Sequence, residues 1–200
     1  MFAVIFEVQP KPDRWDQYLE LAKLLRPELE RIDGFIDNER FRSRRTAGRL
    51  LSLSIWADEK AVVRWRTHAM HHGVQEKGRF EVFQDYHLRV GEITADTQLP
   101  PGRKLAQQRF DVTEVGGAKI ISIAEGDAIP EPPGAGVQDA ELYESITTEG
   151  KLLRLVSWSD SEAAEAWQPA SGRLRRVRVI RDYGMHDRRE APQFYPDVPR

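Results

Sequence analysis

The sequence predicts an α+β protein built from two ferredoxin-like βαββαβ halves, the second of which lacks helices. Three observations support this fold class. Strand-like and helix-like patterns follow the order βαββαβ over residues 1–92. Residues 41–65 align without a gap on residues 143–167, with ten identities in twenty-five positions. Residues 125–140, at the place of the first half's long helix, contain three prolines and three glycines, which disfavour a helix.

The first half opens with a strand and a long helix. Phe2–Val8 is apolar on both alternating faces, which is typical of a strand covered on both sides. Asp13 is placed to cap a helix over residues 15–32, in which Pro27 should cause a kink or a restart. Gly34 suits the end of this helix.

Two strands follow, at Phe35–Ser43 and Arg49–Trp56. Asp58 is a predicted N-cap for a second helix over residues 59–75, whose apolar residues recur every three or four positions. Gly78 should end that helix, and Asp85–Val90 forms the returning strand. The first half therefore completes βαββαβ.

The chain divides into residues 1–96, a degenerate repeat over residues 103–184, and a tail over residues 185–200. A Pro-Pro-Gly linker separates the halves. The first strand of the repeat is expected at residues 119–124, with a hairpin to residues 110–115. The tail is polar and rich in proline, so we expect an arm that is partly disordered.

The composition excludes several classes of protein. Hydrophobic residues make up 40% of the chain and charged residues 31%, with a net charge of −2, so neither nucleic acid nor a membrane surface is an expected partner. The absence of cysteine excludes disulfides and thiolate chemistry, and fits a reducing compartment. There is no signal-peptide pattern and no long apolar run, so the expected location is cytoplasmic.

Residues 1–92 resemble the antibiotic biosynthesis monooxygenase family through five short motifs in the same order. They are Gly34-Phe35, Ser54-Ile55-Trp56, the W-R-x-H-x-x-H run Trp65 to His71, Gly78-Arg79, and the D-Y-x-x-R-V run Asp85 to Val90. The resemblance implies a dimeric α+β barrel, in which two such units pack sheet to sheet. Here one chain could supply both units as an intramolecular pseudo-dimer, or it could form a homodimer.

The resemblance also implies a reaction. Similar proteins oxidise small electron-rich aromatic or polyketide molecules with O₂ and without a cofactor, because the deprotonated substrate supplies the electrons. Such a site needs an apolar pocket and a base with a pKa near neutrality, which histidine provides.

The candidate catalytic residues are His71 or His68 as the base and Arg79 as an anion stabiliser. The candidate substrate-binding residues are Trp65, Phe35, His72, Tyr86 and Trp56. On an ideal helix, His68 and His72 share a face with Trp65, whereas the family motif points to His71. A bend in the helix would reconcile these two interpretations.

Each candidate has a structural alternative. The histidines would also serve as polar groups near a helix end. His68 and His72, with Glu76 or His87, have the spacing of a metal site, although no metal is expected. Trp56 and Trp65 recur in the half that has lost the histidines, which favours a core role. The arginines at positions 40–49 and 173–181 are expected to form solvated faces.

Two rival functions remain open from the sequence. The first is haem binding or degradation, for which Gln75 and Glu7 replace the histidine and the amide that related proteins carry. The second is a barrel that binds small molecules without catalysis.

Overall fold

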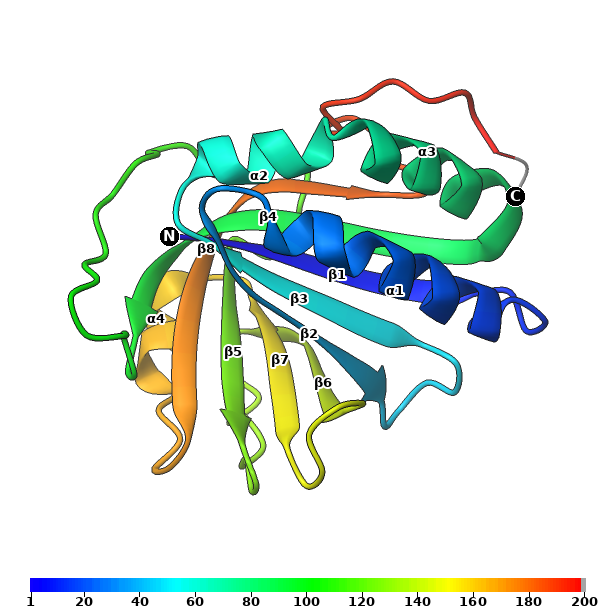
Figure 1. Ribbon diagram of the computed structural model, residues 1–200. Coiled ribbons are helices and arrows are strands. Elements are labelled where there is room, and N and C mark those ends of the chain that lie inside the picture. Colours follow the sequence, from blue (N-terminus) through cyan, green and yellow to red (C-terminus); the bar gives the residue numbers. More distant parts are fainter. Residues whose placement is uncertain (199–200) are drawn as a thin grey trace.

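The computed structural model describes residues 1–198 as a closed eight-stranded barrel with helices on its outer surface (Figure 1). In chain order the elements are β1 (Phe2–Pro10), α1 (Trp15–Glu30), β2 (Phe35–Ser43), β3 (Leu50–Trp56), α2 (Glu59–Arg66), α3 (Ala69–Lys77), the π-helical turn η1 (Gly78–Val82), β4 (Phe83–Asp96), β5 (Ile120–Gly126), β6 (Val137–Ser145), β7 (Leu152–Trp158), α4 (Ser161–Ala166) and β8 (Arg173–Gly184).

The strand order around the barrel is β1-β3-β2-β6-β7-β5-β8-β4, and every neighbouring pair is antiparallel. The first half contributes β1 to β4 and the second half β5 to β8. The halves join at two seams, where β2 pairs with β6 and β4 pairs with β8. The two predicted halves therefore form one barrel within a single chain, joined through their edge strands as well as by packing of their inner faces.

The two apolar faces of β1 have different neighbours. Ala3 and Ile5 point into the barrel, where they join a core built from all eight strands. Phe2 and Val8 point outward and pack beneath the helices. This two-sided burial explains why both parities of the strand are apolar, as the sequence predicted.

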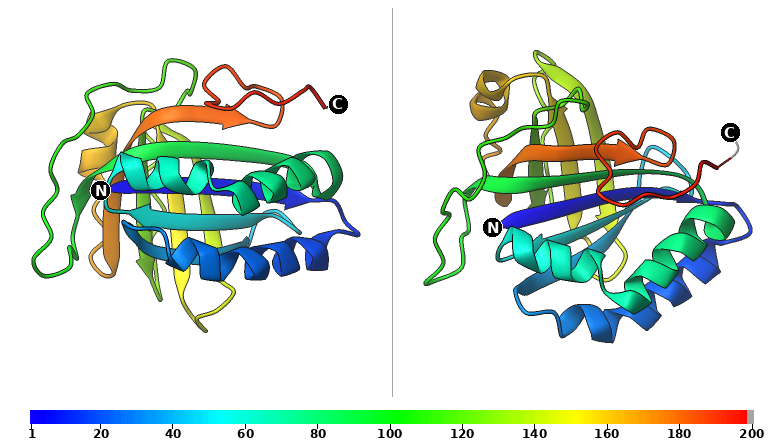
Figure 2. Two further views of the ribbon diagram at one scale, coloured as in Figure 1. Left: turned by 45° about the horizontal axis from the view of Figure 1, so that its top comes forward. Right: turned by 90° about the horizontal axis from the view of Figure 1, so that it is seen from above.

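The helices are distributed unequally between the halves. Helices α1, α2 and α3 cover the outer face of the β1–β4 half, whereas α4 is the helix that lies against the β5–β8 half (Figures 1 and 2). The prediction that the second half lacks helices is therefore wrong in one respect. A single helix of six residues persists there, because Asp160 caps it at its start and Pro169 follows soon after its end.

The halves share local details beyond the aligned segment. Asp58 accepts a hydrogen bond from Ala61 N at 2.8 Å, and Asp160 accepts one from Ala163 N at 2.8 Å. Gly34 and Gly136 both have positive φ, and a Cβ on either would lie within 2.7 Å of the alanine in the facing helix. Glycine is therefore required at both positions. A common origin of the halves by duplication stays a prediction.

Several predicted boundaries differ from the structure. The helix expected over residues 59–75 is two helices, because His68 has an extended backbone at the start of α3. Asp13 does not cap α1, whose N-cap position is Arg14, and Pro27 is accommodated in the last turn without a break. Residues 110–115 form no strand. Within residues 1–198 no helix combines the length and apolarity needed to cross a bilayer.

Candidate active site

A cavity of about 200 Å³ lies between the outer face of the β1–β4 half and helices α1, α2 and α3. Its floor is formed by two rows of residues that run across five adjacent strands. The rows are Asn38–Ser54–Val4–Val90–Arg181 and Arg40–Ser52–Phe6–Leu88–Tyr183. The floor is thus apolar in the middle, polar on β2 and β3, and carries a cation at each end, Arg40 on β2 and Arg181 on β8.

The helices form the roof of this cavity. Helix α1 contributes apolar side chains such as Leu25, α2 contributes Trp65, and α3 contributes His71 and Gln75. The C-terminal arm, defined here as residues 185–198, supplies further lining through Gln193 and Tyr195. The absence of a cavity at this place would have favoured a barrel with a purely structural role.

His71 is held in a defined orientation beside Trp65. The two rings are stacked with their centroids 4.1 Å apart, and His71 Nδ1 lies 2.9 Å from the backbone oxygen of Trp65. A carbonyl oxygen accepts only, so Nδ1 carries the proton and Nε2 is left with a free lone pair. Burial lowers the pKa of His71 to about 4, so the ring is neutral at pH 7.

The break between α2 and α3 decides which histidine meets the cavity. It turns α3 back so that His71, rather than His72, stacks on Trp65. His68 lies 3.8 Å from Glu28, and His72 is exposed with Nδ1 at 3.1 Å from the hydroxyl of Tyr195. Neither His68 nor His72 lines the cavity. The bend that would reconcile helix geometry with the family motif is therefore present.

Arg79 and Tyr86 stand where the cavity meets the arm. Arg79 is 2% exposed and donates hydrogen bonds to the backbone oxygens of Met185, at 2.6 Å, and Pro196, at 3.1 Å. The Tyr86 hydroxyl accepts from Arg188 at 2.6 Å. Both predicted residues line the cavity, and both also hold the arm in place.

Phe35 and Trp56 do not line the cavity. Their rings pack edge to face, 5.5 Å apart, in the layer between sheet and helices. Trp56 is fully buried and donates to Ser54 Oγ at 2.9 Å, as Trp158 does to Ser122 at 3.0 Å in the second half. Phe35 and Trp56 therefore pack in the core. Of the two predicted tryptophans, Trp65 is the one that lines the cavity.

The cavity's most distinctive chemical feature is its arginines, of which the sequence reasoning identified Arg79 and missed the other four. Five line the cavity, and none forms an ion pair within residues 1–198: Arg40, Arg66, Arg79, Arg181 and Arg188. The one carboxylate in the described lining, Glu59, is bound to Arg109 at 2.7 and 2.8 Å. Arg40 and Arg181 belong to the two runs predicted to be solvated, so that prediction is wrong for them.

The second half contributes residues to this site. Strand β8 brings Arg181 and Tyr183 to the floor, and the arm that follows it closes the end beside α3 (Figure 2). On its own outer face the second half has only α4 to form a roof within the described chain. The expected single site in the first half therefore uses side chains from both halves.

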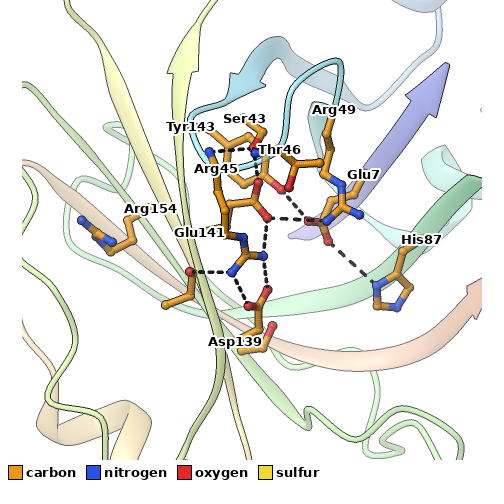
Figure 3. A network of polar contacts seen from close by, with 12 residues as sticks. Glu7, Ser43, Arg45, Thr46, Arg49, His87, Asp139, Glu141, Tyr143 and Arg154 are labelled. Atoms are coloured by element: carbon orange, nitrogen blue, oxygen red, sulfur yellow. Dashed lines mark hydrogen bonds and ion pairs between the residues drawn. The ribbon is translucent and has the colours of Figure 1, made fainter. Parts of the chain in front are cut away.

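A second, open cavity of about 610 Å³ lies at one end of the barrel and is lined by charged residues. Figure 3 shows the polar network that borders it, which joins the two halves. Arg45 contacts Asp139 at 2.7 Å and the buried Glu141 at 2.6 Å. Tyr143 donates to Glu7 at 2.5 Å, and Arg89 also binds Glu7. These charges are paired within the protein, unlike the arginines of the first cavity.

The residues weighed for a metal site do not come together. Within residues 1–198, no group of three or more histidine, cysteine, aspartate or glutamate side chains is placed to hold a metal, so His68, His72, Glu76 and His87 form no such site. Gln75 lines the helix-side cavity, whereas Glu7 points into the barrel toward Tyr143. The two positions considered for haem thus lie on opposite faces of the sheet.

Comparison with known proteins gives a consistent family. Residues 1–77 match the family model described as antibiotic biosynthesis monooxygenase. Over 215 aligned residues the chain is 44% identical to a protein of Pyricularia oryzae named jasmonate monooxygenase ABM, and the alignment covers 98% of this chain and 99% of that one.

Solved structures of similar fold include the aldoxime dehydratase OxdRE in complex with butyraldoxime, with a TM-score of 0.57 and 10% identity over 90% of this chain and 79% of that one. A crystal structure of an antibiotic biosynthesis monooxygenase has a TM-score of 0.43 and 17% identity, and the match covers 48% of this chain and 100% of that one. The first likeness shows that the fold extends across both halves.

Proposed function

The chain belongs to the antibiotic biosynthesis monooxygenase family, and on that basis we propose that it oxygenates a small, largely apolar carboxylic acid of the jasmonate class. We infer the substrate class from five arginines that line an apolar cavity and have no carboxylate partner. Arginine is the side chain best suited to bind a carboxylate through paired N–H groups. The named activity of the Pyricularia oryzae relative agrees with this class.

The size and polarity of the cavity limit the substrate further. A volume of about 200 Å³ lies below the usual range for drug-sized ligands, about 300–1,000 Å³, so a small molecule is expected. Val4, Phe6, Leu88 and Val90 offer an apolar surface for a ring or an alkyl chain. Jasmonates, which are cyclopentanones with an acetic acid side chain and a short alkyl chain, have this combination of groups.

Any proposed reaction must name the source of the electrons that reduce O₂. Hydroxylation of a C–H bond with O₂ places one oxygen atom in the product and releases the other as water, and it consumes two electrons and two protons. We propose that no resident cofactor is bound and that the substrate itself is activated by deprotonation, with Nε2 of His71 as the base. A carbanion or enol reacts with O₂ without a reductant and forms a C–O bond, so that R–H and O₂ give the hydroperoxide R–OOH. Reduction of this hydroperoxide to the alcohol and water, like hydroxylation of an unactivated C–H bond, requires an external two-electron reductant.

The test is oxygen uptake by the purified protein with jasmonic acid and with its methyl ester, each with and without reduced nicotinamide. Uptake with the acid alone supports a reaction that needs no cofactor. Uptake that requires reduced nicotinamide contradicts the cofactor-free part of the proposal. Equal use of acid and ester contradicts the carboxylate site.

Arginine variants test the same site directly. Arg181→Gln and Arg66→Gln remove lining cations whose side chains form no hydrogen bond within residues 1–198, so folding should be little affected. Each should raise KM for the acid by about 10-fold to 100-fold, since hydrogen bonds to charged groups contribute about 1.5–3 kcal/mol, and should leave KM for the ester nearly unchanged. Arg44→Gln, on the exposed hairpin turn, is the matched control.

An electron-rich aromatic substrate, which the family resemblance implies, is the second candidate. The apolar floor and the Trp65–His71 stack would accept a flat ring. Oxygen uptake with a panel of hydroquinones and anthrones separates the two substrate classes. Haem chemistry is tested by titration with haemin, where a stoichiometric Soret shift lost in His71→Gln would contradict both candidates.

A further inference from the structure

The β2–β3 end of the cavity floor contains a buried hydrogen-bond acceptor that has no partner. Asn38 is 5% exposed, and its Nδ2 donates to Ser52 Oγ at 3.1 Å and to the backbone oxygen of Leu53 at 3.0 Å. Because a backbone oxygen can only accept, this contact fixes the orientation of the amide. Asn38 Oδ1 is then a buried acceptor without a donor in the described protein.

Two serine hydroxyl groups beside Asn38 each have a proton without a hydrogen-bond acceptor. Ser52 Oγ accepts from Asn38, and Ser54 Oγ accepts from the indole N–H of Trp56 at 2.9 Å. Neither hydroxyl donates to any other group within residues 1–198, so both O–H protons are available to a ligand. We call Asn38, Ser52 and Ser54 the polar edge. Buried groups of this kind are normally satisfied, so an unpaired set marks a place for a ligand.

The polar edge matches one functional group closely. A ketone oxygen accepts hydrogen bonds from the serine hydroxyls but gives nothing to Asn38. The enol of the same ketone accepts from a serine and also donates its own O–H to Asn38 Oδ1. The site therefore binds the enol more strongly than the ketone, which is the differential binding that accelerates a reaction.

We propose that the polar edge binds the carbonyl oxygen of a ketone-bearing substrate and stabilises its enol, so that Asn38 and Ser52 are substrate-positioning residues. This inference rests on the proposed function, because it assigns the other end of the same substrate. Conversion to the enol moves one proton from the α-carbon to the oxygen and requires no oxidant or reductant. His71 Nε2, in the same cavity, is the base that takes the carbon-bound proton.

The placement also orients the substrate. Asn38 and Arg181 belong to the same row and are separated by four strand spacings, roughly 19 Å between backbones at about 4.8 Å each. The proposed orientation places the ketone toward β2, beside the polar edge, and the carboxylate toward Arg181 on β8, although Arg40 supplies a second lining cation at the β2 end.

The experiment is hydrogen–deuterium exchange at the α-carbon without oxygen. A cyclopentanone-bearing carboxylic acid is incubated anaerobically in D₂O with the full-length protein, and deuterium incorporation is followed by mass spectrometry. The wild-type protein should catalyse exchange, and Asn38→Ala and Ser52→Ala should each slow it by about 10-fold to 100-fold. Binding of the corresponding cyclopentane, which lacks the oxygen atom and makes no hydrogen bond to the polar edge, should be much less affected by either change.

Ser122→Ala is the matched control, because Ser122 accepts from Trp158 in the second half and does not line the cavity. Melting temperatures identify any variant that fails to fold, and Ser52→Ala leaves the Asn38–Leu53 contact intact if Asn38→Ala unfolds. No exchange by the wild-type protein, or unchanged exchange in both folded variants, would overturn this inference. Oxygen uptake, measured separately, reports on the proposed function itself.

Discussion

At the scale of single residues, the proposed chemistry of the cavity depends on His71. Its Nδ1 proton is committed to the Trp65 backbone oxygen, and burial lowers its pKa to about 4. A histidine at its ordinary pKa of about 6.5 would be half protonated in mildly acidic solution. Here the ring stays neutral over the whole neutral range, so Nε2 has a free lone pair, but the pKa of about 4 makes His71 a weaker base than the near-neutral one expected from the sequence.

The low pKa leads to a prediction for activity. The acid limb of kcat/KM against pH should have its midpoint near pH 4, because protonation of His71 removes the base. His71→Gln keeps a donor for the Trp65 oxygen but should lower kcat by about 100-fold to 10,000-fold. Lys77→Gln, at the exposed end of α3, should be unaffected. A midpoint near pH 6.5 would show that a different group is the base.

The same residue should also affect stability. The unfolded chain binds a proton at His71 below about pH 6.5, whereas the folded chain does so only near pH 4. The folded state therefore loses stability as the pH falls from about 6.5 to about 4. His71→Phe should show a smaller loss over this interval in urea unfolding experiments at several pH values. An equal loss in both proteins would mean that His71 is not buried in this way.

Residue chemistry was only partly predictable from the sequence. Short motifs identified Trp65, His71, Arg79 and Tyr86, and all four line the cavity. The unpaired state of Arg181 or of Asn38 Oδ1 could not be predicted, because it depends on which side chains from distant strands fail to reach them. The signal for Arg40 and Arg181 was present in the alternation of their strands, which places both on the helix side of the sheet.

At the scale of elements, the start of α2 controls the position of Trp65. The N-cap bond from Asp58 fixes the first turn of this helix, and Asp160 makes the same bond at α4. Asp58→Ala and Asp160→Ala should each cost about 1 kcal/mol of stability in urea unfolding, the usual contribution of a cap. Only Asp58→Ala should also raise KM, since α2 lines the cavity. Equal effects on KM would contradict the assignment of the site to the first half.

The elements were predicted well where local patterns decide them and poorly where tertiary contacts do. Alternating apolar residues identified β1 and β3, the alignment of residues 143–167 on residues 41–65 points to β7, and the Asp58 cap is confirmed. The sequence has no glycine or proline at the break between α2 and α3 that would have predicted it. The strand expected over residues 110–115 is absent because this segment crosses the barrel surface, where Thr113 N bonds to Val179 O at 2.8 Å.

At the scale of the whole molecule, the polar network of Figure 3 connects the halves through the barrel. Arg45→Met leaves Glu141, which is 1% exposed, without its closest cation. The expected loss is about 2 kcal/mol in the free energy of unfolding, because Glu141 is buried while Arg45 is half exposed and Arg49 remains at 3.6 Å. Arg42→Met breaks an exposed contact of 3.9 Å and should cost under about 1 kcal/mol.

Acidification provides a check on this prediction. The hydrogen bond from Arg45 lowers the pKa of Asp139, so the pair stabilises the fold above the ordinary carboxylate pKa and loses that contribution as the pH falls through the lowered value. The stability difference between the wild-type protein and Arg45→Met should therefore narrow in strong acid. Chemical denaturation at pH 7 and pH 3 measures it, and a constant difference would contradict the role of Asp139.

Because the barrel closes within one chain, the amino-acid sequences of its two halves can change independently. In a symmetric pair of identical subunits, each substitution appears twice, once on either side of the interface. In this chain a substitution alters one half alone, so the β5–β8 half is free to shorten its helices while it still supplies Arg181 and the arm to the other half. Dilution cannot separate two halves that share one chain.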